Sequence, residues 1–142
     1  MPAPKFVREI MTRGPTSLDH DARLLDAALV MRSSGFRHLP VVNSGRVVGL
    51  ISDRDVQRAS PSMFKRMSPE EYNRIFETTP IEKIMATDPV TVRPDTPLTE
   101  VVKLMHEGKF GSVPVVEGDK QLVGIVTVTD LLGVLSSLLS KS

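Results

Sequence analysis

Residues 36–55 read FRHLPVVNSGRVVGLISDRD, and residues 110–130 read FGSVPVVEGDKQLVGIVTVTD. In both stretches, two runs of mainly β-branched and apolar residues flank a short polar turn, which is typical of a β-hairpin. Each second run ends at a Ser or Thr that stands three residues before an Asp, and this is the pattern of a capped helix N-terminus. The sequence therefore predicts a hairpin that leads directly into a helix, and it predicts this unit twice.

The two stretches belong to a repeat that covers most of the chain. The copies match with an offset of 74 residues as far as Pro40 and Pro114, and with an offset of 75 after the turn, where Asp55 meets Asp130. An internal repeat decides the fold and has to be recognised first. Only two copies are present, so we expect a pseudo-twofold pair and not a solenoid. Further matched pairs are Ile10 with Ile84, Met11 with Met85, Pro15 with Pro89, Leu24 with Leu98, Met31 with Met105 and Gly49 with Gly124.

Each copy predicts the element order β-α-β-β-α, which places the chain in the α/β (α+β) class as two tandem repeats. A short extended piece precedes a helix whose apolar residues keep helical spacing. We expect Asp21 to open this helix in the first copy, and Thr96 to cap it in the second, with Pro97 at the first helical position. The predicted organisation is repeat 1 at residues 1–60, an inserted linker helix at 61–80 and repeat 2 at 81–142, together forming one module.

The inserted helix is predicted from the sequence SPEEY at residues 68–72. Ser68 is the expected cap, with Pro69 at the first position and Glu71 at the third. Tyr72 then forms one apolar face with Ile75 and Phe76. We expect this face to pack over the sheet, and the alternative is a lid or a partner contact.

Composition narrows the function classes. The 142 residues carry a formal net charge of +1 and only 4% aromatic residues, so nucleic-acid binding has little support. There is no cysteine, which excludes disulfides and thiolate zinc sites. No apolar run suggests a membrane span, and the first residues do not resemble a secretory signal, so we expect a cytoplasmic protein.

No motif of a catalytic or metal site is present. A phosphate loop, a dinucleotide fingerprint, a zinc motif and a nucleophile elbow are all absent from the sequence. The three histidines, His20, His38 and His106, lack the spacing of metal ligands. Asp19, His20 and Asp21 are expected to form a polar turn and not a cation site. We therefore predict that the protein is not an enzyme and needs no catalytic cofactor.

With the β-α-β-β-α repeat in view, the sequence resembles a CBS domain pair, also called a Bateman module. The resemblance rests on RHLPVV and GSVPVV around the two prolines, and on GLISDRD and GIVTVTD at residues 49–55 and 124–130. The inserted helix before IEKIM is more distantly similar to stand-alone bacterial CBS proteins of the acetoin-utilisation type. The resemblance implies binding of AMP, ADP or ATP, or less often S-adenosylmethionine or NAD, in clefts between the repeats.

The resemblance also implies which residues form those clefts. One cleft would combine Thr127, Thr129 and Asp130 with Thr16, Phe36, Arg37 and His38. The other would combine Ser52, Arg54 and Asp55 with Val90, Phe110, Gly111 and Ser112, with Lys109 nearby.

The chemistry of these residues suits a nucleotide. A strand that turns directly into a helix points N–H groups at a phosphate, and a carboxylate can accept from both ribose hydroxyls. Gly49 and Gly124 would let the ligand approach the backbone closely. The alternative is that Ser-x-x-Asp and Thr-x-x-Asp are helix caps and need no ligand. Arg37 and His38 match positions that often carry basic phosphate ligands, whereas Gly111 and Ser112 do not, so we expect unequal clefts.

A rival interpretation is a ligand-independent dimerisation or protein-interaction module, with nucleic-acid binding as a distant third. The last helix is apolar over most of its circumference, and such a helix is normally buried on more than one side. We expect a homodimer through the repeat helices and an effector protein that the sequence does not identify. The apolar residues concerned are Leu131, Leu132, Val134, Leu135, Leu138 and Leu139.

Overall fold

The structure is a computed structural model that describes residues 3–62 and 66–141, so residues 63–65 of the expected linker at 61–80 lie outside the described part. The chain divides into two compact units. Unit 1 consists of Met1–Pro15 together with Pro89–Ser142, and unit 2 consists of Thr16–Asp88.

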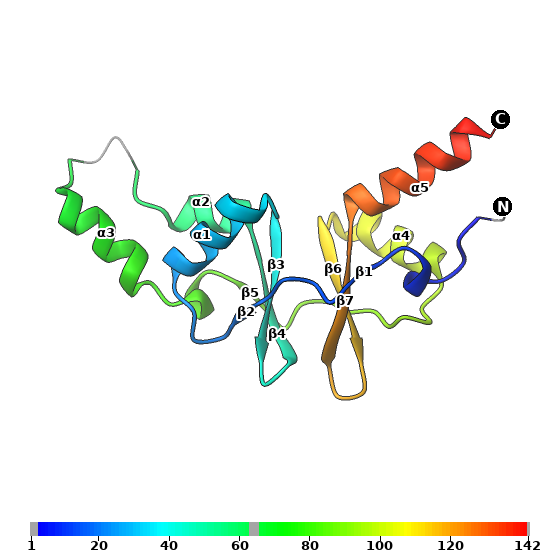
Figure 1. Ribbon diagram of the computed structural model, residues 1–142, viewed down its shortest axis with the longest axis horizontal. Coiled ribbons are helices and arrows are strands. Elements are labelled where there is room, and N and C mark those ends of the chain that lie inside the picture. Colours follow the sequence, from blue (N-terminus) through cyan, green and yellow to red (C-terminus); the bar gives the residue numbers. More distant parts are fainter. Residues whose placement is uncertain (1–2, 63–65, 142) are drawn as a thin grey trace. The chain divides into compact units, whose positions relative to one another are not determined.

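Unit 2 contains a four-stranded sheet in the order β2-β3-β4-β5. Figure 1 labels these strands. Strand β2 runs parallel to β3, while β3 with β4 and β4 with β5 are antiparallel. The β3–β4 pair is the hairpin predicted from the sequence. The elements in chain order are β2 (Leu18–Asp19), α1 (Leu24–Ser34), β3 (His38–Asn43), β4 (Arg46–Ser52), α2 (Asp53–Ala59), α3 (Pro69–Thr78), the 3-10 helix η2 (Ile81–Lys83) and β5 (Ala86–Thr87).

Unit 1 repeats this arrangement. Strand β6 pairs with β7, β7 pairs with β1, and Val92 forms a single parallel bridge to Val115 where unit 2 has β2. The predicted β-α-β-β-α order is therefore confirmed, with the first strand of the second copy reduced to one bridge. The elements are the 3-10 helix η1 (Val7–Glu9), β1 (Thr12–Arg13), α4 (Leu98–Gly108), β6 (Ser112–Glu117), β7 (Gln121–Thr127) and α5 (Val128–Ser140).

We call residues 5–13 the leading segment of the first sequence copy and residues 79–87 that of the second. Each leading segment packs in the unit that the other copy forms. In unit 1, the N–H of Val7 donates to the carbonyl of Thr96 at 3.0 Å, and the N–H of Leu98 donates to the carbonyl of Lys5 at 2.8 Å. In unit 2, the N–H of Leu24 donates to the carbonyl of Thr79 at 2.9 Å. Each spatial unit thus contains the leading segment of one sequence copy and the remaining elements of the other copy.

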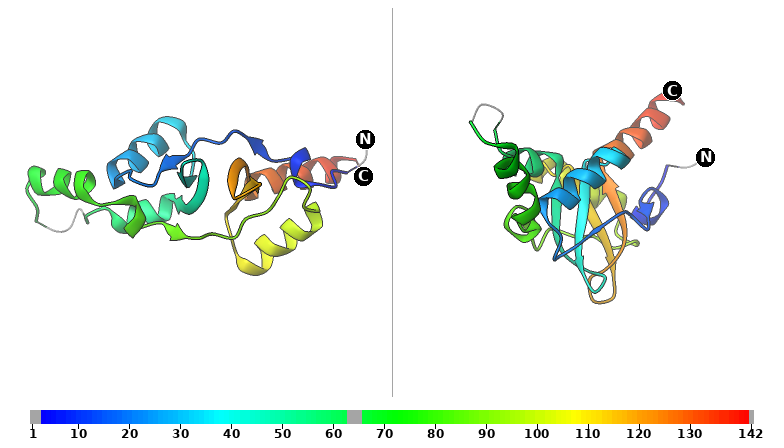
Figure 2. Two further views of the ribbon diagram at one scale, coloured as in Figure 1. Left: turned by 90° about the horizontal axis from the view of Figure 1, so that it is seen from below. Right: turned by 60° about the vertical axis from the view of Figure 1, so that its left-hand side comes forward.

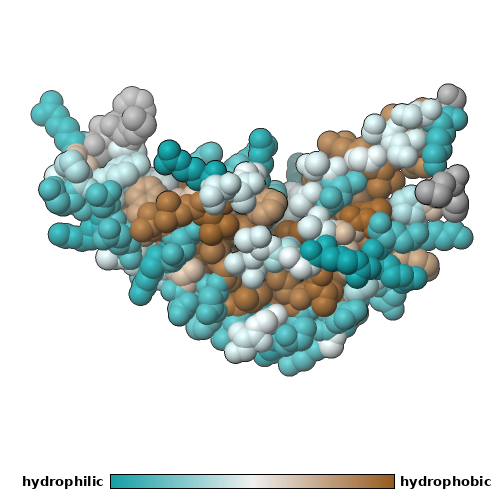
Figure 3. Space-filling view, viewed as in Figure 1, coloured by the Kyte–Doolittle hydropathy of each residue, from teal (hydrophilic) through white to brown (hydrophobic). Residues whose placement is uncertain are grey.

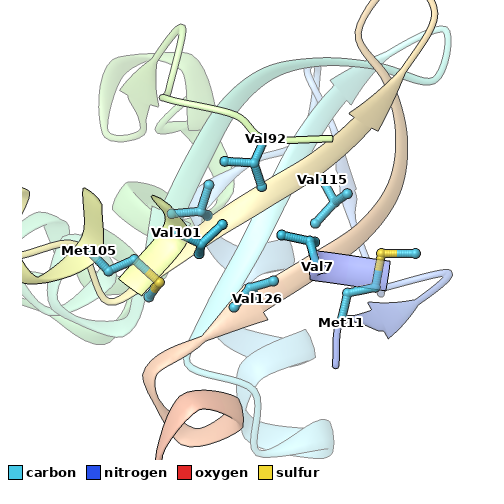
Figure 4. Packing of buried hydrophobic residues seen from close by; sticks show 8 residues of the cluster. Val7, Met11, Val92, Val101, Met105, Val115 and Val126 are labelled. Carbon is cyan, nitrogen blue, oxygen red and sulfur yellow. The ribbon is translucent and has the colours of Figure 1, made fainter. Parts of the chain in front are cut away.

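Each unit has its own hydrophobic core. In unit 1, Val7 and Met11 from the leading segment pack with Val92, Val101, Met105, Val113, Val115 and Val126 (Figure 4). In unit 2, Ile81 from the other leading segment packs with Leu18, Ala27, Leu39, Val41 and Ile51. Alternate residues of each hairpin face the core, as the two-residue period of a strand requires.

The two helix starts differ from the sequence-based expectation. Helix α1 begins at Leu24, where the carboxylate of Asp26 accepts from the N–H of Arg23 at 2.8 Å, so Asp21 does not open it. Helix α4 begins at Leu98, and the hydroxyl of Thr96 instead accepts from the N–H of Arg93 in the preceding turn. In both helices the N–H of the first residue donates to a leading segment. These long-range bonds set the helix starts and are invisible in local sequence.

Helix α3 has the predicted N-cap, but it does not pack against the element that we expected. The hydroxyl of Ser68 accepts from the N–H of Glu71 at 3.2 Å, which confirms the cap. The rings of Tyr72 and Phe76 lie 5.1 Å apart on one face. The helix packs chiefly against α1 and not over the strands (Figure 2), so the expected packing on the sheet was wrong.

Candidate functional site

The strand-to-helix turn of unit 2 is a complete capping box. The hydroxyl of Ser52 accepts from the N–H of Asp55 at 3.2 Å, while Oδ2 of Asp55 accepts from the N–H of Ser52 at 2.8 Å and from its hydroxyl at 2.9 Å. This arrangement holds both side chains at the start of α2.

The equivalent turn of unit 1 has the same bonds. Oδ2 of Asp130 accepts from the N–H of Thr127 at 2.8 Å and from its hydroxyl at 3.1 Å, and the N–H of Asp130 donates back to that hydroxyl at 3.3 Å. The predicted caps are thus confirmed in both copies, and a cap of this kind is compatible with a ligand at the same residues. Because these bonds use Oδ2, each half-buried aspartate keeps Oδ1 as an acceptor for a ligand.

The residues before each hairpin lie beside these turns. His38 stands opposite Ser52 in the β3–β4 ladder, and Ser112 stands opposite Thr127 in the β6–β7 ladder. The N–H of Asp53 donates to the carbonyl of Arg37 at 2.9 Å. The structure therefore brings the two sequence motifs of one copy together at one edge of its own unit. We use the name edge 1 for residues 111–112 with residues 127–130, in unit 1, and the name edge 2 for residues 37–38 with residues 52–55, in unit 2.

Most of the backbone N–H groups at the starts of α2 and α5, which the sequence suggested as phosphate ligands, already donate hydrogen bonds within the protein. At edge 2, the N–H groups of Asp53 and Asp55 donate within the protein, and the N–H of Arg54 donates to the carboxylate of Asp53 at 2.9 Å. At edge 1, the N–H of Val128 donates to the carbonyl of Gly111 at 3.1 Å. Recognition of a phosphate would consequently rest mainly on side chains.

Edge 2 differs from edge 1 in its titratable groups. Burial of the imidazole lowers the pKa of His38 below its ordinary value, and this effect outweighs the opposing influence of the Asp53 and Asp55 carboxylates. His38 is thus mainly neutral near pH 7. Arg37 before it is exposed and carries a permanent positive charge.

Edge 1 has a hydroxyl where edge 2 has the imidazole. Ser112 is only 3% exposed, and its Oγ has no hydrogen-bond partner among the described residues. It lies on the face of β6 opposite to the one whose Val113 and Val115 enter the core. An unpaired buried hydroxyl is uncommon and invites explanation.

Apolar side chains near both edges are exposed. Phe36 precedes β3 with 47% of its surface exposed, and Phe110 precedes β6 with 37% exposed. Val90 is also exposed, in the extended segment that precedes α4. Such side chains supply the apolar surface that a base requires.

The predicted site residues divide between the units. Thr16, Phe36, Arg37, His38, Ser52, Arg54 and Asp55 belong to unit 2, whereas Val90, Phe110, Gly111, Ser112, Thr127, Thr129 and Asp130 belong to unit 1. Within each unit the structure brings together the strand start and the strand-to-helix turn. The pairing of residues from different repeats into two clefts stays a prediction.

A hollow of about 590 Å³ in unit 1 adds residues that sequence reasoning missed. Thr129 and Asp130 line it together with Glu9 and Ile10 from the leading segment. No sequence pattern indicates the last two, because they come from the other copy of the repeat. The remaining lining residues are Ala3, Pro4, Gly133, Val134, Ser137, Leu138 and Lys141.

Gly49 and Gly124 have a packing role that the sequence did not suggest. A Cβ on Gly49 would collide with the side chain of Met85, and one on Gly124 would lie 2.8 Å from Sδ of Met11. Close approach of a ligand to the backbone was the expected reason for these glycines. The structure shows that they make room for the methionines of the leading segments, and close approach of a ligand stays a prediction.

The turn after β2 is polar, as predicted. Nδ1 of His20 lies 3.1 Å from Oε1 of Glu82, and this hydrogen bond raises the pKa of His20. Across the described ranges, no group of three or more acidic or histidine side chains is placed to hold a metal ion. Within the same ranges, no helix has both the length and the apolar character needed to cross a bilayer.

Comparison with known proteins identifies the repeat. The family model of the CBS domain matches residues 7–62 and again residues 81–137. A putative acetoin utilization protein (AcuB) from Vibrio cholerae is 34% identical with a TM-score of 0.77, covering 95% of this chain and 93% of that one. This similarity agrees with the resemblance noted for the inserted helix.

Two further solved structures contain adenosine compounds. The CBS domain pair of protein MJ0100, in complex with 5′-methylthioadenosine and S-adenosylmethionine, is 26% identical with a TM-score of 0.78, covering 96% of this chain and 98% of that one. The cytosolic domain of the Mg²⁺ channel MgtE in complex with ATP is 29% identical with a TM-score of 0.72, and the match covers 92% of this chain and 48% of that one.

Proposed function

This chain belongs to the CBS domain family, and on that premise we propose that it is a regulatory module that binds an adenosine nucleotide of the AMP, ADP or ATP class. The observation that carries the proposal is the duplicated edge, in which a Ser or Thr and an Asp are fixed by a capping box beside the start of the preceding strand. Relatives crystallised with adenosine compounds support the ligand class.

Each group at the edges has a defined task in this proposal. Oδ1 of Asp55 and of Asp130 accepts from ribose hydroxyls, since Oδ2 is already occupied by the cap. Phe36 and Phe110 cover the adenine ring with apolar surface. Arg37 contacts the phosphate with a charge-assisted hydrogen bond. S-adenosylmethionine and NAD are the alternative ligands, because both contain adenosine.

Thermal unfolding in the presence of single ligands tests this function. A ligand present at about 100 times its dissociation constant stabilises the fold by about 2.7 kcal/mol. For a domain of this size that corresponds to a rise in Tm of roughly 5 to 15 °C. The ligands to compare are AMP, ADP, ATP, S-adenosylmethionine and NAD, with inosine monophosphate as a control for the base. If none of the adenosine compounds raises Tm at millimolar concentration, the proposal fails.

The second candidate is an assembly module, and the surface of α5 favours it. Leu132, Leu135 and Leu139 are 56%, 48% and 65% exposed. Figure 3 shows hydrophobic surface, in brown, along α5. Leu131 packs against the core of unit 1 and so explains only one side of the helix. We propose that a second copy of the chain covers the exposed leucines. The two functions are compatible, because a sensor can act as a dimer.

A further inference from the structure

The start of β3 gathers four ionisable groups within a few residues. His38 is half-buried at the first position of the strand, with Arg37 directly before it. From the start of α2, the carboxylates of Asp53 and Asp55 act on the imidazole in the opposite direction to Arg37. Asp53 is tied to this strand start by the hydrogen bond from its N–H to the carbonyl of Arg37. The imidazole is thus surrounded by charges whose balance a ligand would alter.

The charge balance determines the protonation of His38. Burial penalises the imidazolium and the nearby guanidinium adds repulsion, while the two carboxylates only partly compensate, so the pKa of His38 is lowered in the free protein. An anionic group at this edge adds negative charge beside the imidazole. Such a charge favours the imidazolium form and raises the pKa.

We propose that an anionic ligand whose negative charge lies beside His38 is taken up together with a proton, which settles on the imidazole. This inference rests on the proposed function and adds a regulatory property to it. The module would respond to the concentration of nucleotide and to pH at once.

Thermodynamic linkage between ligand binding and proton binding determines how the affinity changes with pH. In the pH interval between the lowered pKa of free His38 and its raised pKa in the complex, binding takes up part of one proton, so affinity falls as pH rises. The slope cannot exceed about tenfold in affinity per pH unit for one proton. Well below the free pKa, His38 is already charged, and proton uptake vanishes.

The other copy of the repeat provides an internal contrast. Ser112 occupies the position of His38 in unit 1 and stands opposite Thr127 as His38 stands opposite Ser52. A serine hydroxyl does not titrate near neutral pH. Proton uptake by this mechanism therefore accompanies only the ligand that lies beside His38.

Calorimetric titration with AMP in two buffers of different ionisation enthalpy measures the protons taken up. The full chain is compared with His38→Gln and with His106→Gln, in which an exposed histidine of α4 is replaced. Because the phosphate of AMP itself titrates at about pH 6, its own protons contribute to every measurement, and only the difference between the proteins reports on His38. At about pH 6.5 to 7 we expect AMP binding to take up fewer protons in His38→Gln than in the unchanged chain. We expect no such loss in His106→Gln.

The outcomes separate the two proposals. AMP binding with equal proton uptake in His38→Gln and the unchanged chain overturns the inference and leaves the proposed function intact. Absence of AMP binding to the unchanged chain removes the proposed AMP site, and the inference falls with it. If His38→Gln does not fold, NMR titration of His38 in the unchanged chain replaces the variant, and a pKa that AMP does not raise overturns the inference.

Discussion

Met11 lies against Gly124, with its Sδ 2.8 Å from the position that a Cβ on Gly124 would occupy. Met85 stands in the same relation to Gly49, at a distance that also leaves no room for a side chain. In each pair the methionine comes from the leading segment of one sequence copy and the glycine from the hairpin of the other. The glycines of the repeated motif thus leave the space that the methionines of the leading segments fill.

Gly124→Ala should lower the free energy of unfolding. The new Cβ would meet both Sδ of Met11 and, at 3.0 Å, the backbone oxygen of Thr12, which cannot turn away as a side chain can. Overpacking of this kind typically costs about 1 to 3 kcal/mol. Urea unfolding followed by circular dichroism measures the change.

Gly133→Ala is the matched control for this substitution. A Cβ on Gly133 meets nothing within 4 Å, and the residue lies inside α5. Replacing a helical glycine by alanine stabilises by up to about 1 kcal/mol. Equal stability of Gly124→Ala and the unchanged chain would show that the leading segment is not held as the structure indicates.

Much of the fold could be predicted from the sequence, because its signals are local. The hairpins follow from the β-branched runs, and the caps at Ser52, Ser68 and Thr127 follow from short motifs whose bonds the structure contains. The exchange of leading segments was not predictable in this way. It depends on bonds such as that from Leu24 to Thr79, between residues far apart in the chain.

The candidate site was predictable only in part, for related reasons. The side chains of each edge could be chosen from the repeated motifs and from the family resemblance. The protonation of His38 depends on burial, and burial is a property of the folded chain. Glu9 and Ile10 reach the hollow beside Asp130 only through the exchanged segment, so no spacing in the sequence points to them.

Ser112→Ala should raise the stability of the free protein and weaken binding of the ligand that contacts Ser112, which the family resemblance assigns to Asp55. The buried Oγ has no partner among the described residues, so its removal abolishes a desolvation penalty of about 1 to 3 kcal/mol. If that hydroxyl bonds a ligand, the variant loses affinity at the same time. Thermal unfolding with and without AMP measures both effects.

Ser136→Ala provides the comparison for Ser112→Ala, because Ser136 is exposed on α5. It should change neither stability nor affinity by more than a few tenths of a kcal/mol, as is usual for surface substitutions. A stabilised Ser112→Ala protein with unchanged affinity would remove Ser112 from the site. A destabilised one would mean that its hydroxyl is paired in solution.

Leu135→Asp should shift a dimer toward monomer. Leu135 is 48% exposed on α5, and a second copy covering it would bury an unpaired carboxylate in the variant, which is costly. Light scattering after size exclusion at micromolar concentration measures the mass. Ser137→Asp introduces the same charge at an exposed position of α5 that helical spacing sets away from the three leucines, and it controls for general repulsion. A monomeric unchanged chain would contradict the dimer proposal.

The site that contains Asp130 should bind nucleotide more tightly than the site that contains Asp55. The two capping boxes are alike to within a few tenths of an ångström, so they do not separate the sites. The pairing implied by the family resemblance assigns Arg37 to the ligand of Asp130 and Gly111 to the ligand of Asp55. A guanidinium contact to a phosphate contributes about 1.5 to 3 kcal/mol, or roughly ten- to a hundredfold in affinity.

Calorimetry on Asp55→Asn and Asp130→Asn, each measured separately, decides this ranking. Asparagine keeps an acceptor oxygen for the cap, so the helix starts are preserved while the charge toward the ribose is lost. We expect Asp130→Asn to abolish the tighter binding event and Asp55→Asn to leave it in place. Arg37→Gln should then weaken that same event about tenfold or more, because it removes the charge that distinguishes the two sites. Loss of the tighter event in Asp55→Asn alone would reverse the ranking and reassign Arg37 to the ligand held at its own edge.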